Sequence, residues 1–260
     1  MQTLGRVLRA GVVLGIAAVT FSTVAAQGRG AAPQTPAAPA PPPTGKAGAP
    51  VDLTGTWVSV VTEDWRWRMV TPPKGDYASL PITMEAKKAA DAWDPAKDEA
   101  AGEACKGYGA PGLMRQPTRL RITWQDDTTM KVEADAGTQT RLLHFGDWKA
   151  PGGAATLQGD TTASWETGAR GRGGNTPQPP PMFGNLKTVT KNLRPGYLRK
   201  NGVPYSDKTT LTEYWDLLRQ PNGEQWLVIT THCSPFGWRS RSQYSVSVVL
   251  SLYGTPFLRR

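Results

Sequence analysis

The sequence predicts a mainly β fold, either an antiparallel barrel or a sandwich, with one or two short helices. Three observations lead to this prediction. Short segments of alternating apolar and polar residues recur along the chain, the dipeptide Asn222-Gly223 stands between two of them, and helical patterns are confined to residues 83–103. Alternation over about four to eight residues is typical of half-buried strands, and Asn-Gly is the strongest short hairpin signal.

The clearest strand pattern lies on both sides of the turn at Asp126-Asp127. Apolar side chains occupy every second position there, which predicts a hairpin with one buried face; they are Leu120, Ile122, Trp124, Met130, Val132 and Ala134. Valine, threonine and tryptophan also fill the stretch from Val51 to Val70. The same composition and turn residues predict further strands over residues 138–145, 161–167, 185–193, 209–218 and 224–231.

Two short helices are expected in the middle of the chain. Residues 83–93 suit a helix with Thr83 as its N-cap. Asp94-Pro95 then starts a second helix, with the aspartate as cap and proline at the first position, running to about Glu103. Glycine-rich loops are expected over residues 151–160 and 168–185.

The N-terminal fifth of the chain has the composition of an export signal and a spacer. Residues 1–26 combine a basic start, a short apolar run and the small-residue site Val24-Ala25-Ala26, as a cleavable signal peptide does. Residues 27–50 are almost entirely alanine, proline and glycine and predict a disordered linker. We therefore expect a periplasmic or extracellular protein without a transmembrane segment after cleavage, whose β-barrel domain spans residues 51–232.

The net charge of +9 does not indicate a nucleic-acid-binding protein. Residues 1–50 and 233–260 each carry four basic residues and no acidic one, which leaves 22 of the 30 basic residues against 21 acidic ones in between. Nucleic-acid binding needs a concentrated basic face. Metal and cofactor sites are equally unsupported, because His144 and His232 are the only histidines and no cofactor motif is present.

Cys105 and Cys233 are the two cysteines of the chain. Thiols of exported proteins tend to pair, so a disulfide between them is one alternative and two free thiols the other. The spacing of the two residues in the sequence does not decide between these alternatives.

The stretch "LTGTW", residues 53–57, resembles the Gly-x-Trp opening of lipocalins, with Gly55 and Trp57 in the matching structural positions. Over residues 51–231 the chain resembles an uncharacterised family of exported bacterial proteins with a lipocalin-like (calycin-type) barrel. The runs "AWDPAKDEAAGEACKGYG", "MRQPTRLRITWQDD" and "RPGYLRKNGVPYS" carry this resemblance. It implies a barrel and an exported location, and no chemistry.

The chain departs from that family after Thr231. No acidic residue follows Glu224, while serine and arginine become frequent. Residues 233–260 are therefore interpreted as a divergent tail, with an altered reading frame as the sharper hypothesis. Either interpretation leaves open whether the barrel closes.

The stretch "TEDWRWRMV", residues 62–70, is the most distinctive candidate site. As a strand it would place Trp65 and Trp67 on one face and Arg66 and Arg68, solvated, on the other. The simpler interpretation is that the tryptophans pack in the core. In the functional interpretation they form a ligand-binding wall at the barrel mouth, which other side chains extend: Glu63, Tyr77, Tyr108 and Tyr197.

These patterns favour binding of a small apolar or aromatic molecule without catalysis. No catalytic residue is assigned, because no serine, histidine or aspartate lies in a recognisable nucleophile motif. One alternative is an extracytoplasmic enzyme acting on carbohydrate or lipid through Glu63, Asp64 or Tyr197. A second alternative is a structural envelope protein without a ligand.

Overall fold

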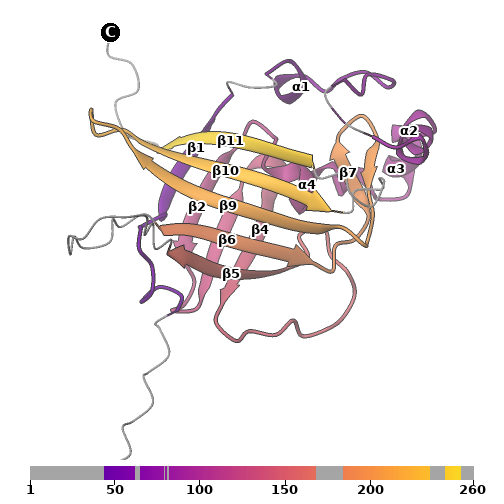
Figure 1. The fold of residues 1–260 in the computed structure, drawn as a ribbon. Coiled ribbons are helices and arrows are strands. Elements are labelled where there is room, and N and C mark those ends of the chain that lie inside the picture. Colours follow the sequence, from indigo (N-terminus) through magenta and orange to yellow (C-terminus); the bar gives the residue numbers. More distant parts are fainter. Residues whose placement is uncertain are drawn as a thin grey trace, which may run out of the picture. The chain divides into compact units, whose positions relative to one another are not determined.

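The computed structural model describes residues 44–61, 65–78, 80, 82–167, 184–234 and 244–252 (Figure 1). Within these ranges the fold is mainly β, as predicted. Nine of the described strands form one closed barrel in the order β1-β11-β10-β9-β6-β5-β4-β3-β2. They are β1 (Gly55–Val60), β2 (Arg119–Trp124), β3 (Thr129–Ala134), β4 (Gln139–Phe145), β5 (Asp160–Thr167), β6 (Gly184–Lys191), β9 (Thr210–Arg219), β10 (Gln225–Ser234) and β11 (Tyr244–Leu252).

The predicted antiparallel pairing fails at one pair of barrel strands. β4 and β5 run parallel, with Leu143 opposite Thr161. A tight turn can only join antiparallel neighbours, and a parallel pair needs a longer crossover connection. The glycine-containing loop between Phe145 and Asp160 supplies that length. The sheet is therefore mixed.

The tail supplies the strand that closes the barrel. β11 pairs with β10 on one side and with β1 on the other, where Trp57 lies opposite Leu252. Leu250 of β11 is buried in the common core. The barrel therefore closes through β11, which belongs to the divergent tail. The altered reading frame stays a prediction.

The helices and a small hairpin gather beside one end of the barrel (Figure 1). The hairpin pairs β7 (Gly196–Arg199) with β8 (Val203–Tyr205). Four α-helices are described here, more than the one or two expected, and they are α1 (Trp65–Met69), α2 (Met84–Asp91), α3 (Pro95–Ala100) and α4 (Ala110–Leu113). The 3₁₀ turn η1 (Ala104–Tyr108) packs against β7. All four residues of α4 are buried, and Leu113 belongs to the core cluster. We call this end of the barrel, with its helices and hairpin, the capped end.

Both predicted helix starts are confirmed by their caps. The Thr83 side chain accepts a hydrogen bond from the Ala86 amide at the start of α2. The Asp94 side chain accepts one from the Ala96 amide, and Pro95 follows at the first position of α3. α2 ends at Asp91 and the Asp94 N-cap precedes α3, so Trp93 lies in the short connection between the two helices.

Inward-facing side chains of the strands pack together to form the core. The largest fully buried side chains are Trp57 and Trp215. The Trp57 indole Nε1 donates a hydrogen bond to the Leu53 carbonyl at 2.9 Å. Other fully buried apolar residues of the barrel are Leu120, Ile122, Met130, Leu143, Leu186, Leu211, Leu227 and Ile229. Within the described ranges no helix is long and apolar enough to cross a membrane.

Candidate functional site

A cleft of about 270 Å³ lies at the capped end of the barrel. The connection between α2 and α3, the turn η1 and the strand β7 each contribute an aromatic ring to it. We call it the rim cleft, and its lining residues are Trp93, Pro95, Asp98, Glu99, Ala104, Gly107, Tyr108, Tyr197 and Lys200. The mixture of flat apolar rings with a few charged groups is typical of a small-molecule site.

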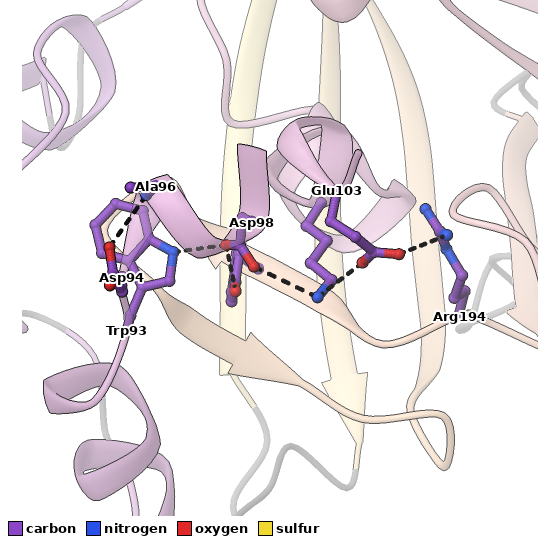
Figure 2. A network of polar contacts seen from close by, with 8 residues as sticks. Trp93, Asp94, Ala96, Asp98, Glu103 and Arg194 are labelled. Carbon is purple, nitrogen blue, oxygen red and sulfur yellow. Dashed lines mark hydrogen bonds and ion pairs between the residues drawn. The ribbon is translucent and has the colours of Figure 1, made fainter. Parts of the chain in front are cut away.

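A hydrogen-bond network on Asp98 fixes two of the three rings (Figure 2). The Trp93 indole donates to Asp98 Oδ2 at 2.8 Å, and the Tyr197 hydroxyl donates to the same oxygen at 2.6 Å. Lys106 continues the network by approaching Asp98 Oδ1 at 3.6 Å and Glu103 at 2.7 Å. The two rings meet edge to face, with centroids 6.0 Å apart. One carboxylate therefore holds rings from two distant segments in a fixed arrangement.

The same network fixes the protonation states in the cleft. Burial, followed by the hydrogen bond to Asp98, raises the pKa of the Tyr197 phenol well above its usual value. Burial alone would raise the pKa of Asp98, but hydrogen bonds from Tyr197 and Trp93 and the nearby Lys106 ammonium outweigh it and lower that pKa. At neutral pH the phenol stays protonated and the carboxylate stays ionised.

Lys200 and Tyr108 form another part of the lining. The Lys200 ammonium donates to the Tyr108 hydroxyl at 2.8 Å and lies 4.4 Å from the centre of that ring. The Lys200 stem packs on Gly107, where the Cβ of a larger residue would approach Lys200 Cγ to 3.1 Å. Lys200 is held by the β7–β8 turn, whose Asn201 is fully buried and donates to the Pro73 and Asp76 carbonyls.

A smaller crevice of about 20 Å³ lies on the other side of Lys200. We call it the arginine crevice, because Arg68, Arg115 and Arg199 line it together with Lys200. All three arginines are at most 5% exposed. Arg68 donates through Nε to the Arg115 carbonyl at 3.1 Å, and Arg199 donates to the Ala78 carbonyl at 2.9 Å, among other contacts.

The stretch around Trp65 is a helix, so its prediction as a strand is wrong. In α1 the Trp65 side chain is 65% exposed, whereas Arg68, expected to be solvated, is buried. Trp67 is partly buried against the arginine crevice, with its ring 5.5 Å from the Arg199 guanidinium. The two tryptophans therefore do not share one face. Glu63 and Asp64 lie outside the described residues.

Two of the three tyrosines predicted for the binding wall lie in the rim cleft, and the third does not. Tyr108 and Tyr197 both line the rim cleft. Tyr77 is buried away from it and donates to Asp91 of α2 at 2.8 Å. Sequence reasoning missed Trp93, Asp98 and Lys200. The available signal was the position of Trp93 directly before the predicted N-cap Asp94, which places this ring in the connection between two helices.

Sequence reasoning also missed a buried ion pair inside the barrel. Arg141 of β4 and Glu213 of β9 form a two-fold contact, with Nη1–Oε1 at 3.0 Å and Nη2–Oε2 at 2.6 Å. Their side chains are 1% and 0% exposed. Thr188 donates to Glu213 at 3.0 Å, and Thr190 accepts from Arg141 at 3.3 Å. Both charges are thus paired and hydrogen-bonded, which burial of charge requires.

The structure does not join the two cysteines. Cys105 is exposed in η1, and Cys233 is buried in β10; both are free thiols. Burial raises the pKa of the Cys233 thiol strongly. Within the described part of the chain, no group of three or more His, Cys, Asp or Glu side chains could hold a metal ion.

Comparison with protein-family models, with curated proteins and with solved structures finds no match. The closed barrel is compatible with a lipocalin-like build.

Proposed function

We propose that this protein binds a small apolar or aromatic molecule in the rim cleft and performs no chemistry on it. The observation that carries the proposal is the convergence of Trp93, Tyr108 and Tyr197, from three separate elements, on one cleft of about 270 Å³. Aromatic rings bury a large area at low entropic cost because they have few rotatable bonds. A ring or a short apolar chain fits these walls.

Large side chains buried inside the barrel support a site at the rim instead of the centre. Trp57 and Trp215 are both at most 1% exposed, and the Arg141–Glu213 pair is fully buried among the strands as well. A ligand in the centre would have to displace large side chains from a close-packed interior, which is costly. The rim cleft needs no such rearrangement.

The electrostatics of the cleft favour binding over acid–base catalysis. A general acid or base works best with a pKa near the operating pH. The pKa shifts of Tyr197 and Asp98 lead away from neutral pH. The pKa of the phenol lies above its usual value, and the pKa of the carboxyl lies below its usual value. Both groups therefore hold structure in the cleft and are poorly suited to proton transfer.

The proposal includes an exported, lipocalin-like protein. The supporting features are the signal-like residues 1–26, the alanine- and proline-rich linker 27–50 and the Gly55-x-Trp57 opening of β1. N-terminal sequencing of protein from its native host is expected to give a mature chain starting near Gln27. An intact Met1 on soluble cytoplasmic protein would contradict export.

The binding site is tested with N-phenyl-1-naphthylamine, a neutral aromatic probe whose fluorescence rises in apolar surroundings. We expect saturable binding that Trp93→Ala weakens at least tenfold. Trp65→Ala is the matched control, because Trp65 is exposed on α1 and does not line the cleft. Equal probe affinity in wild type and in a folded Trp93→Ala variant would refute the rim cleft as the binding site.

A further inference from the structure

Lys200 stands between two hollows of different character. It lines both the aromatic rim cleft and the arginine crevice. Its ammonium carries three N–H donors, of which one goes to the Tyr108 hydroxyl. Among the described residues no carboxylate lies within ion-pair distance of it, and Lys200 is partly exposed. A positively charged group with spare donors therefore faces the cleft.

The other lysine at this site is already neutralised. The Lys106 ammonium pairs with Glu103 at 2.7 Å and with Asp98 at 3.6 Å, and these carboxylates raise its pKa. Glu103 is also 3.2 Å from Arg194 (Figure 2). The chain thus provides counter-charges for Lys106 and Arg194, and Lys200 differs from both in this respect.

The acidic residues of the cleft do not cancel the charge of Lys200. Asp98 is engaged by Lys106 and by the hydrogen bonds from Trp93 and Tyr197. Glu99 is exposed, so that water screens its charge. On the other side of Lys200, the residues that line the arginine crevice include four cations and no carboxylate.

We propose that the natural ligand is an aromatic or apolar acid, whose carboxylate or similar monoanionic group pairs with Lys200 while its ring lies among Trp93, Tyr108 and Tyr197. The arginine crevice is too small for a ring, since about 20 Å³ holds an atom or two of water or oxygen size. The anionic end of the ligand thus points toward the crevice and the ring occupies the larger cleft. This inference rests on the proposed function and adds the charge of the ligand.

Two probes with one skeleton test the charge separately from the ring. They are 8-anilino-1-naphthalenesulfonate, a monoanion, and N-phenyl-1-naphthylamine, which lacks the sulfonate. Wild type is expected to bind the anion about fivefold to tenfold more tightly than the neutral probe. Lys200→Gln is expected to abolish that preference and Lys200→Arg to keep it. The preference is also expected to shrink as salt rises from 0.1 M to 1 M, because the screening length falls from about 10 Å to about 3 Å.

Lys97→Gln is the control for charge in general. Lys97 is exposed on α3, one residue from Asp98, and does not line the cleft. Its removal is expected to leave the ratio of the two affinities unchanged. Circular dichroism of each variant checks that it is folded, and Lys200→Arg retains the bulk of the side chain if Lys200→Gln loses structure.

The outcomes separate the two proposals. A neutral probe that binds as tightly as the anion, or a preference that survives in Lys200→Gln, would overturn the acidic ligand and leave the rim cleft standing. The proposal of an acidic ligand would also be overturned if Lys97→Gln reduced the preference for the anionic probe as much as Lys200→Gln does. If Trp93→Ala affects neither probe, the rim cleft itself is refuted.

Discussion

The hydroxyl of Tyr197 donates a 2.6 Å hydrogen bond to the carboxylate of Asp98. The two residues are far apart in the sequence, in the hairpin strand β7 and in the short helix α3. Because α3 has no buried residue of its own, this bond and the contact of Asp98 with Lys106 of η1 attach it to the rest of the capped end. The shape of the rim cleft therefore depends on Asp98 and its two donors.

Tyr197→Phe removes the hydroxyl and keeps the ring. Hydrogen bonds to charged groups contribute roughly 1.5–3 kcal/mol to stability, so we expect a loss of about 1–2 kcal/mol at this partly exposed site. Urea denaturation measures it. Probe affinity is expected to fall less in Tyr197→Phe than in Tyr197→Ala, which also removes the wall. Equal affinities for the two variants would show that the ring of Tyr197 does not contact the ligand.

Gly202 of the β7–β8 turn is expected to control the position of Trp93. Its φ is +86°, and a Cβ there would approach Trp93 Cβ and Cγ to 2.4 Å. Gly202→Ala therefore displaces Trp93 in addition to straining the backbone. Gly75→Ala is the matched control, because Gly75 has a φ of +93° but nothing within 4 Å of its Cβ position.

Both alanine variants are expected to lose about 1–2 kcal/mol from the left-handed backbone conformation alone. Only Gly202→Ala is expected to weaken probe binding and to shift the emission of Trp93. Thermal melts and probe titrations on the two variants make the comparison. Probe binding that is unaffected in Gly202→Ala would mean that the position of Trp93 does not matter for the site.

The buried Arg141–Glu213 pair predicts a strongly non-additive response. Glu213→Leu or Arg141→Met alone leaves an uncompensated charge in the core, which costs about 3–5 kcal/mol. The double variant Arg141→Met with Glu213→Leu removes both charges and is expected to be more stable than either single variant. Chemical denaturation of the four proteins forms a double-mutant cycle. Additive losses would contradict a direct pairing of the two side chains.

Asp135 predicts a dependence of stability on acid pH. Its carboxylate accepts hydrogen bonds at 2.7 Å from Thr118 Oγ1, the Arg119 amide and Arg119 Nε. Burial alone would raise its pKa, but these bonds and the Arg119 charge lower it to about 2. In the unfolded chain an Asp has a pKa of about 3.9. The stabilisation is therefore fully present above pH 4 and is lost as the pH falls toward 2.

The Asp135→Asn variant isolates this contribution. Because the carboxylate side chain is 46% exposed, solvent screening reduces the effect to about 1 kcal/mol at neutral pH. The difference in unfolding free energy between wild type and variant is expected to shrink steadily from pH 4 to pH 2. A difference that stays constant over this range would exclude Asp135 as its source.

Local signals in the sequence predict the elements whose causes are local. The alternation on both sides of Asp126-Asp127 appears as β2 and β3, and Asn222-Gly223 joins β9 to β10. The caps at Thr83 and Asp94 start α2 and α3 as expected. Each of these features depends on residues within a few positions of one another. Periodicity and capping are therefore sufficient to find them.

Features that depend on distant partners could not be predicted from the sequence. Arg68 is buried where its guanidinium donates to the Arg115 carbonyl, 47 positions away. Arg68 lies in the helix α1, although the alternation of its neighbours predicted a strand. Arg141 and Glu213 are 72 positions apart and sit at inward-facing positions that an apolar residue would equally fill. The rim cleft likewise combines side chains from three separate segments. Sequence patterns predicted only two of its three aromatic residues, Tyr108 and Tyr197.

The most direct test of the rim cleft follows its tryptophans one by one. The chain has ten tryptophans; incorporation of 5-fluorotryptophan gives each a ¹⁹F resonance, and single Trp→Phe variants assign Trp93, Trp57 and Trp215. On titration with N-phenyl-1-naphthylamine the account predicts a saturable shift of the Trp93 resonance, while the resonances of Trp57 and Trp215 in the barrel core stay in place. Shifts of Trp57 and Trp215 with Trp93 unmoved would put the ligand inside the barrel and contradict the account.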